Sequence, residues 1–486
     1  MSTHLRPRYA VDAVLVLWVL VLGAGVISAS AMSQDGYRRT VTFVEGAGLS
    51  LPSDFVAQQM PITAYAATPR ATCGPGDHPE HVQGQAATGS TAFTCNLREI
   101  GHVGPRAWLA FAKYTHCAYY ATPGTLESLQ PGGYQGPGDG VVVVDGSHPA
   151  HPRVTTILTS GAMLYPHEGL RVNDRRGLLA AMSGGVSAAD GAYANPFFDA
   201  YDIAKDCAHP RLLGSTVLPG VSGHEGNFSP DGRTFYSSSV TPGQWTALDI
   251  TNPASPSVLH VEYGYSTHGL SFSKDGKRAY FAHLGNFGAP YNALTPAEAR
   301  GFGNGLLVFD TSEIQARKPN PQVKLISTLF WKDGSAAQVP FTFTSRGKPY
   351  LLMNDEFGPG GVSSGGSHAR IIDLSDERHP RVVSQLVLEA QLKGQGDIHY
   401  CGLDRDRDPT VAGCSGWKSS QGIRVFDIRD VHHPREIAYY SVPNNAPGTQ
   451  VYFQPDGEVW FTDQRFGFSI AKFTHGVWPL PKARRP

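Results

Sequence analysis

VVVVDGSHPAHPRVTTIL, residues 141–158, is an apolar strand that ends in Asp145, a short turn that contains proline, and a second apolar strand. The same pattern returns with copies that begin at Ala200, Thr246, Leu306, Ala369 and Ile423. The aspartates that end the first strand of the copies are Asp145, Asp202, Asp249, Asp310, Asp373 and Asp427. Their spacing of roughly 45 to 65 residues is the period of a four-stranded propeller blade and not of a helical solenoid. The repeat therefore predicts a β-propeller.

The composition agrees with one large all-β domain. The chain has 486 residues, with 55 Gly, 36 Pro and 10% aromatic residues, which are the turn formers and strand formers of many short strands. Its 40 Lys and Arg are balanced by 41 Asp and Glu, for a formal net charge of −1. Because a protein that follows a phosphate backbone needs a basic surface, we expect no nucleic-acid partner.

The order of strands predicts seven blades and a particular closure of the ring. Each blade can be written as an inner, second, third and outer strand, but the last blade, from Thr449 to His475, has only three. CNLREIGHV, from Cys95, precedes the first inner strand and resembles the outer strands of the other blades. We expect this N-terminal strand to complete the C-terminal blade, because a closed ring leaves no open sheet edge.

The N-terminus predicts export. Arg6 and Arg8 precede an apolar run from Ala13 to Ile27, and Ala29-Ser30-Ala31 has the small-x-small pattern of a signal-peptidase site. Residues 1–31 are therefore a signal peptide or, since the run is long enough to span a bilayer, an N-terminal membrane anchor with membrane association. We assign residues 32–94 to an irregular extension, 95–475 to the propeller and 476–486 to a C-terminal tail. The expected location is extracellular, periplasmic or at the cell surface.

The six cysteines of an exported chain favour disulfides over thiol chemistry. Six cysteines allow about 15 pairings, so most of the connectivity cannot be derived. Cys401 and Cys414 flank DRDRDPT as partners across one hairpin would, and we predict that bond. Cys73 and Cys95 are the candidates for fastening the N-terminal extension.

The third strands, VVVVD at residues 141–145 and LLVFD at residues 306–310, resemble those of the LVIVD-repeat family of exported bacterial and archaeal propellers. The resemblance covers roughly Leu97 to Phe473. It departs in the fifth blade, whose inner strand lacks the usual His and Asp-Gly turn. The resemblance implies the propeller fold and an extracytoplasmic setting, and it implies no reaction.

Four inner strands begin with histidine, each seven residues before the aspartate of the following turn: His167, His224, His268 and His399. Seven residues of strand span about 23 Å, so these histidines gather at the end of the strands away from the turns, around the axial channel. Glu168 and Glu225 follow the first two directly. A regular hairpin centred on Asp275-Gly276 would place His283 across from His268.

Imidazoles with carboxylates suit a divalent transition metal such as Zn, Cu, Fe or Mn. The candidate ligands are His167, Glu168, His224, Glu225, His268, His283 and His399, with Glu225 as the expected carboxylate. Two other interpretations stay open. The rings can hydrogen-bond to neighbouring blades and keep them in register, or they can transfer protons.

The same face carries the long loops that follow Thr122, Gly184, Leu284 and Phe357, and such loops on a rigid scaffold are where ligands are usually recognised. Two functions follow. The first is an extracytoplasmic binding or scaffold propeller that engages a protein, a glycan or a small-molecule ligand through this loop face. The second is a metal-dependent enzyme, such as an oxidoreductase, with the His and Glu cluster at the axis. The second architecture resembles the selenium-binding and methanethiol oxidase propellers, although none of their motifs occurs here residue for residue.

Overall fold

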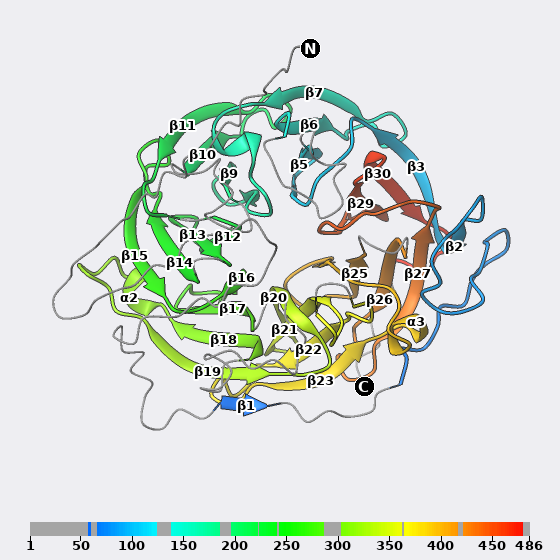
Figure 1. Cartoon of the computed structure of the whole chain (residues 1–486). Helices are drawn as coiled ribbons and strands as arrows, with labels where there is room; N and C mark the ends of the chain where they lie inside the picture. The colour runs from blue at the N-terminus through cyan, green and yellow to red at the C-terminus, as the bar shows by residue number, and fades with distance from the viewer. Residues whose placement is uncertain are drawn as a thin grey trace, which may run out of the picture. The chain divides into compact units, whose positions relative to one another are not determined.

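Seven antiparallel sheets stand side by side around a central axis, as the sequence predicts (Figure 1). This computed structural model describes residues 57–59, 66–123, 138–184, 196–221, 223–240, 243–285, 303–361, 364–416 and 421–479. The N-terminal segment to which we assign a signal peptide or anchor lies outside these residues. Within them, the helical elements are single turns: η1 (Ala162–Leu164), α2 (Ser312–Gln315) and α3 (Glu389–Leu392).

Blades one to three each consist of four consecutive strands. Blade one has β4 (Phe111–Tyr114), β5 (Cys117–Ala121), β6 (Val141–Asp145) and β7 (Arg153–Leu158). Blade two has β8 (Arg171–Asn173), β9 (Leu178–Met182), β10 (Phe197–Asp202) and β11 (Arg211–Val217). Blade three has β12 (Glu225–Phe228), β13 (Thr234–Ser239), β14 (Gln244–Asp249) and β15 (Ser257–Tyr263).

Blades four to six follow the same order. Blade four has β16 (Thr267–Phe272), β17 (Arg278–Leu284), β18 (Asn304–Asp310) and β19 (Lys324–Phe330). Blade five has β20 (Ser335–Ser345), β21 (Lys348–Phe357), β22 (Ala369–Asp373) and β23 (Arg381–Leu386). Blade six has β24 (Tyr400–Leu403), β25 (Val411–Ser415), β26 (Ile423–Asp427) and β27 (Arg435–Ser441).

The seventh blade joins the two ends of the propeller. Its strands are β28 (Tyr452–Phe453), β29 (Glu458–Asp463), β30 (Gly467–Phe473) and, from the N-terminal side, β3 (Leu97–Val103). β3 pairs antiparallel with β30 from Leu97 opposite Phe473 to Val103 opposite Phe468. The predicted closure is therefore confirmed.

The repeated sequence has a repeated structure. In all six copies the aspartate accepts a hydrogen bond from the backbone N–H two residues later, at distances from 2.8 to 3.1 Å. In four copies an arginine at the start of the outer strand pairs with the same carboxylate: Arg153 with Asp145 and Arg211 with Asp202 at 2.8 Å, Arg381 with Asp373 at 3.4 Å and Arg435 with Asp427 at 3.5 Å. The aspartate thus fixes the turn that sends the chain from the third strand to the outer one.

The N-terminal extension contributes two strands to other blades. β1 (Ala57–Gln59) pairs parallel with β19, and β2 (Phe93–Cys95) pairs antiparallel with β27. Arg424 of blade six is buried and donates to Glu80 of the extension at 2.6 and 2.7 Å, and to Glu436 at 3.1 Å. Because a buried guanidinium left without its carboxylates would cost about 3–5 kcal/mol, this network ties the extension to the ring.

The hydrophobic core is divided among the spaces between blades. Tyr119 and Val143 of blade one pack with Leu179 of blade two, and Leu248 of blade three closes a separate cluster with Phe198 of blade two. Two sheets that pack face to face exclude water from such a layer over their full width. Each blade therefore depends on both neighbours for its burial.

Three disulfides account for all six cysteines. Cys401–Cys414 joins directly opposed residues of β24 and β25, with Cα atoms 4.0 Å apart, as predicted. Cys73–Cys95 fastens the extension, and Cys117–Cys207, which the sequence did not reveal, joins blade one to the turn after β10 of blade two. Disulfides of this number are typical of oxidising compartments.

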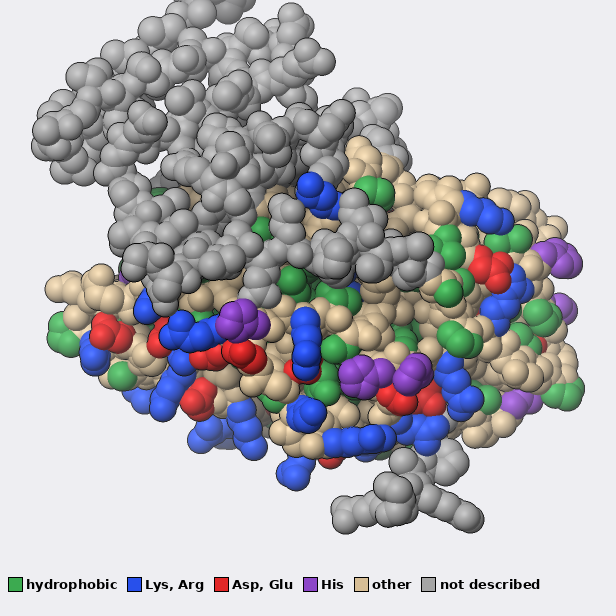
Figure 2. All heavy atoms as spheres, turned by 90° about the horizontal axis from the view of Figure 1, so that it is seen from below, with side chains coloured by type: hydrophobic (Ala, Val, Ile, Leu, Met, Phe, Trp, Pro, Cys, Tyr) green, Lys and Arg blue, Asp and Glu red, His purple; other side chains and the backbone are tan. Residues whose placement is uncertain are grey.

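In a view across the edge of the ring, acidic, basic and histidine side chains lie beside one another (Figure 2). The exposed turns contribute local pairs such as His209 with Asp206 and His379 with Asp376, both at 2.9 Å. Among the described residues, no helix has the length and apolar character needed to cross a membrane.

Removal of β3 tests the closure. A chain that begins after His102 would leave β30 without its outer neighbour, so we expect aggregation or loss of a single cooperative unfolding transition. A chain that begins after Ser53 keeps every described strand and is the control. Size-exclusion chromatography and thermal melting followed by circular dichroism make the comparison; equal melting of both chains would contradict closure by β3.

The disulfides Cys117–Cys207 and Cys401–Cys414 close loops of unequal length, so their removal should lower the free energy of unfolding by unequal amounts. In the chain-entropy model the Cys117–Cys207 bond, with a sequence separation of 90, contributes about 4.6 kcal/mol, and Cys401–Cys414, with a separation of 13, about 3 kcal/mol. We expect the Cys117→Ala/Cys207→Ala variant to unfold at lower denaturant than the Cys401→Ala/Cys414→Ala variant. Urea titration checks the order, and the reverse order would show that the entropy of the unfolded chain does not govern these bonds.

Candidate metal centre

The inner strands of blades two, three, four and six bring polar side chains to the axis. His167 and Glu168 precede β8 of blade two, and His224 directly precedes β12 of blade three. His268 lies in β16 of blade four, and His399 directly precedes β24 of blade six. All five side chains are buried. The sequence prediction that these strand starts share one end of the channel is therefore consistent with the geometry.

Glu168 lies at the middle of this group. Its Oε2 atom is 2.9 Å from Nε2 of His268 and 3.6 Å from Nε2 of His224, and those two nitrogens are 2.7 Å apart. Its Oε1 atom is 3.1 Å from Nε2 of His399. Three histidines from three blades thus direct the same ring nitrogen at one carboxylate.

Backbone carbonyls orient two of the rings. Nδ1 of His268 lies 3.1 Å from the carbonyl oxygen of Gln338, and Nδ1 of His399 lies 2.6 Å from that of Gly448. A carbonyl oxygen can only accept a hydrogen bond, so Nδ1 of each ring must donate. In a neutral ring Nε2 then carries no proton and presents a lone pair. That lone pair faces a carboxylate that also only accepts. A proton between each ring and the carboxylate, or a cation between the groups, would resolve this contact; at His399 the Gln338 amide, 3.0 Å from Nε2, can also donate.

The charges in the cluster affect one another. Burial alone would raise the pKa of Glu168, but the imidazoles of His268 and His399 hold that pKa well below its usual range. Burial alone would lower the pKa of His268 and of His399, but the Glu168 carboxylate raises both.

His167 differs from the other three. Its ring centre is 4.2 Å from that of His224, and its Nδ1 is buried without a hydrogen-bond partner among the described residues. Burial lowers the pKa of His167 to about 4, so the ring is neutral at physiological pH. Its backbone has φ of 44°, in the left-handed region that a non-glycine residue adopts only where its surroundings require it.

Glu225 does not take the central place expected for it. Arg171 and the hydroxyl of Tyr400 both donate to its carboxylate, which is buried. Burial raises the pKa of Glu225 although Arg171 opposes that shift. Glu168 is the carboxylate that the histidines approach; Arg171 donates to its backbone carbonyl at 3.0 Å, and among the described residues no arginine or lysine pairs with its carboxylate.

His283 lies apart from the cluster. The register of blade four places Thr267, and not His268, opposite His283, because an irregularity between Thr267 and Leu270 shifts the pairing. Nδ1 of His283 lies 2.9 Å from the carbonyl oxygen of Gly303, and burial lowers the pKa of this ring to about 4. His268 and His283 are therefore not directly opposite one another, as a regular hairpin would place them.

Gln338 is a residue that sequence reasoning missed, whereas Glu356, at the end of the second strand of blade five, is expected at this rim from the sequence. The amide nitrogen of Gln338 lies 3.0 Å from Nε2 of His399 and 3.3 Å from Oε2 of Glu168, and Glu356 lies 3.9 Å from the same histidine nitrogen. Gln338 is where blade five, which lacks a starting histidine, reaches the axis. Pro340 in the same strand marks the irregularity that displaces it from the position of the other blades' histidines.

Most of the predicted loop face lies outside the described residues. Only the first and last residues of the loops after Thr122, Gly184 and Leu284 are described, so the expected ligand contacts there are untested. The loop after Phe357 is described except for residues 362–363, and its ends meet through the hydrogen bond from Gly358 N to the Ser364 carbonyl at 3.0 Å.

No protein family model and no curated protein matches the chain. Among solved structures, the chain is similar to the β-propeller domain of Cps50 (Swd1) from Myceliophteria thermophila, with a TM-score of 0.52 and 11% identity over 78% of this chain and 100% of that one. The periplasmic gluconolactonase of Pseudomonas aeruginosa has a TM-score of 0.49 and 15% identity, over 67% of this chain and 85% of that one. At these identities the likeness shows the propeller fold alone.

Proposed function

We propose that this protein is an exported β-propeller that binds one divalent transition-metal ion at its axis. The first ligands are Nε2 of His224, Nε2 of His268 and the carboxylate of Glu168. His167 is within reach as a further ligand, because its ring nitrogen, Glu168 and His224 offer donor atoms within 4.8 Å of one another. His399 holds the other oxygen of Glu168.

The observation that carries the proposal is the triangle of donor atoms. Ligands about 2.1 Å from an ion lie about 3.0 Å apart at a right angle and about 3.4 Å apart at the tetrahedral angle. The three separations in the structure are 2.7, 2.9 and 3.6 Å. Two imidazoles and one carboxylate are also a donor set that suits zinc, iron and manganese.

The surroundings support the same conclusion. Metal-bound imidazoles usually donate their other ring N–H to a carbonyl or carboxylate, which fixes the ring, and His268 does so to the carbonyl of Gln338. A cation between the rings and Glu168 would also remove the contact of lone pairs described above. The alternative, that the histidines only keep the blades in register, leaves the buried Nδ1 of His167 without a role.

The chemistry of the proposed centre follows from its ligands. When bound, an ion held by imidazoles and one carboxylate supplies Lewis acidity and, if it is redox-active, electron transfer. The chain's own residues would hold the site together: Arg171 neutralises Glu225, and Gln338 and His399 orient Glu168. A buried centre with this chemistry favours a metal-dependent enzyme over a scaffold. Export and kinship with the LVIVD-repeat propellers belong to the proposal, supported by the three disulfides and the repeated third strand.

Two histidine variants in blade four test the site. His268→Ala removes a proposed ligand, whereas His283→Ala removes a histidine that is equally buried, at 2% exposure, and lies outside the cluster. We expect one equivalent of Zn²⁺ in the wild type and in His283→Ala after dialysis. Because loss of a residue that merely orients a ligand costs about 10- to 100-fold in affinity, loss of a ligand should weaken binding at least about 100-fold. Elemental analysis measures the zinc content, and the Zn²⁺-induced rise in melting temperature measures the affinity.

Glu168→Gln separates the metal site from a purely structural role. Gln keeps the shape of the side chain and can still hydrogen-bond, but it lacks the charge that an ion requires, so the Zn²⁺-induced rise in melting temperature should disappear. A wild type that binds neither Zn²⁺, Mn²⁺, Fe²⁺ nor Cu²⁺ stoichiometrically would contradict the proposal. A lower melting temperature of His268→Ala would then assign the histidines to blade register.

A further inference from the structure

The two oxygens of the Glu168 carboxylate face different groups of side chains. Oε2 lies with Nε2 of His224 and Nε2 of His268 in the metal site proposed above. Oε1 lies instead 3.1 Å from Nε2 of His399, which belongs to blade six. A carboxylate that presents one oxygen to each of two donor groups has the form of a ligand that bridges two metal ions.

His399 is held as a metal ligand would be. Its Nδ1 donates to the carbonyl of Gly448 at 2.6 Å, and metal-bound imidazoles are usually oriented by such a contact. Oε1 of Glu356 lies 3.9 Å from Nε2 of the same ring, so a second carboxylate approaches it from blade five. Ligands about 2.1 Å from one ion lie about 3.0 Å apart at a right angle and about 4.2 Å apart in line with the ion. The separations of 3.1 and 3.9 Å from Nε2 of His399 both fall in that range.

Gln338 of blade five completes the group. Its amide nitrogen is 3.0 Å from Nε2 of His399 and 3.4 Å from Oε1 of Glu168. Its amide oxygen has no hydrogen-bond partner among the described residues. The last torsion of a glutamine side chain is broad, so a half-turn of the amide brings the oxygen to the place of the nitrogen and breaks no bond of that oxygen. The oxygen is then a further donor atom for a cation.

The space between these donors suits an ion better than water. Glu168, Gln338 and His399 are each at most 1% exposed. A water molecule keeps about 2.7–3.0 Å from each hydrogen-bond partner, whereas a transition-metal ion lies about 2.1 Å from its ligands. Donor atoms 3.1 Å apart can therefore hold an ion between them without moving apart.

We propose that the axial centre binds a second metal ion, which Glu168 bridges to the first. The ligands of the second ion are Oε1 of Glu168, Nε2 of His399, the carboxylate of Glu356 and the amide oxygen of Gln338. This inference rests on the proposed metal site, whose ion is bound by Oε2 of the same carboxylate. Because oxygen atoms predominate among the ligands, the second ion is a harder cation such as Mn²⁺, and it is held more weakly than the zinc that stays bound after dialysis.

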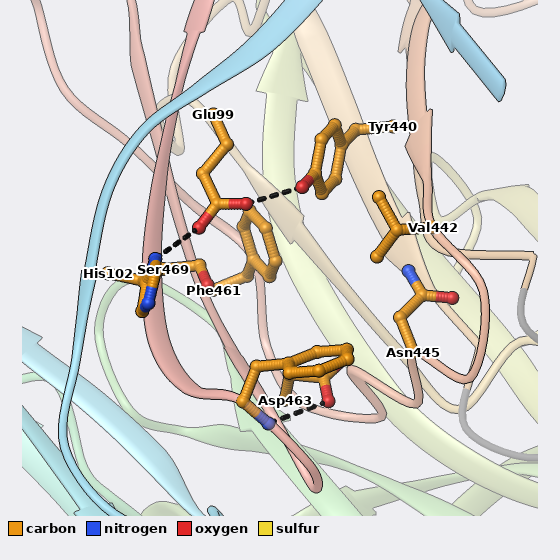
Figure 3. A pocket seen from close by; sticks show the side chains of 9 residues that line it. Glu99, His102, Tyr440, Val442, Asn445, Phe461, Asp463 and Ser469 are labelled. Carbon is orange, nitrogen blue, oxygen red and sulfur yellow. Dashed lines mark hydrogen bonds and ion pairs between the residues drawn. The ribbon is translucent and has the colours of Figure 1, made fainter. Parts of the chain in front are cut away.

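A contact between a carboxylate and an imidazole in another part of the chain supplies the control. Oε1 of Glu99 lies 3.1 Å from Nδ1 of His102, the same separation as between Glu168 and His399 (Figure 3). The other oxygen of Glu99 accepts from the hydroxyl of Tyr440, and the His102 side chain is 68% exposed. This pair is an ordinary ion pair in contact with solvent, so its removal should leave metal binding unchanged.

Titration with Mn²⁺ of protein that holds one equivalent of Zn²⁺ tests the second site. Electron paramagnetic resonance of free Mn²⁺ should show one Mn²⁺ bound per chain in the wild type and in His102→Ala. Glu356→Gln removes a ligand of the second ion only, so it should weaken Mn²⁺ binding at least about 100-fold and keep the zinc. Gln338→Glu replaces the amide by a carboxylate and should strengthen Mn²⁺ binding. With Mn²⁺ at both sites, ions about 3.5–4 Å apart should give a spin-coupled spectrum.

The outcomes distinguish this inference from the proposed function. Zinc that is bound by the wild type and lost in His268→Ala, with no Mn²⁺ bound beside it, would overturn the second site and leave the first. Mn²⁺ that binds equally to the wild type and to Glu356→Gln, or that shows no spin coupling, would also overturn the second site. Weaker Mn²⁺ binding by Gln338→Glu would contradict its ligand set. A wild type that binds neither ion would overturn both sites. If Glu356→Gln does not fold, Glu356→Asp, which shortens the side chain by one methylene, should weaken Mn²⁺ binding in the same direction.

Discussion

The pairing of β3 with β30 is the interaction on which the rest of the structure depends. In six of the sheets the four blade strands are consecutive in sequence, and only the seventh takes one of its four blade strands from the other end of the propeller. Since each layer of the core lies between two blades, an open ring would expose an apolar face on each side of the gap as well as a sheet edge. The buried network of Arg424 with Glu80 and Glu436 reinforces the same closure, because it holds the chain just before β3 against blade six.

Closure of the ring also brings Glu168 and the histidines together at the axis. The Glu168 carboxylate is removed from water, and among the described residues no arginine or lysine pairs with it, since Arg171 reaches only the Glu168 backbone carbonyl. The effective penalty for a buried charge of this kind is several kcal/mol. Histidines of blades three, four and six approach it only because the ring holds their strand starts together. Glu225, 0% exposed, is compensated by Arg171 within the neighbouring blade. The contrast between these two carboxylates separates a structural ion pair from a site that can take a cation.

Most of the fold could be predicted from the repeat in the sequence, because the aspartate and the proline-bearing turn that follows it are local features that recur along the chain. It also led to the closing strand and to Cys401–Cys414, whose partners face each other across one hairpin. Features that depend on irregular register could not be derived in this way. A shift in β16 separates His268 from His283, and another in β20 brings Gln338 to the axis. The choice of Glu168 over Glu225 and the bond between Cys117 and Cys207 depend on contacts between blades, which no single repeat encodes.

Buried polar atoms without partners are not by themselves evidence of a site. Trp245 Nε1 and Thr328 Oγ1 are also without partners among the described residues, and each belongs to a strand interior. His167 differs from these because other metal-ligating groups, Glu168 and His224, converge near it. It lies outside the regular strands, where the backbone is free to place a side chain that the sheet ladder does not need. In a fold whose blades are otherwise built for packing, a bound ligand at such a position can offset the free-energy cost of burying an unpaired polar group.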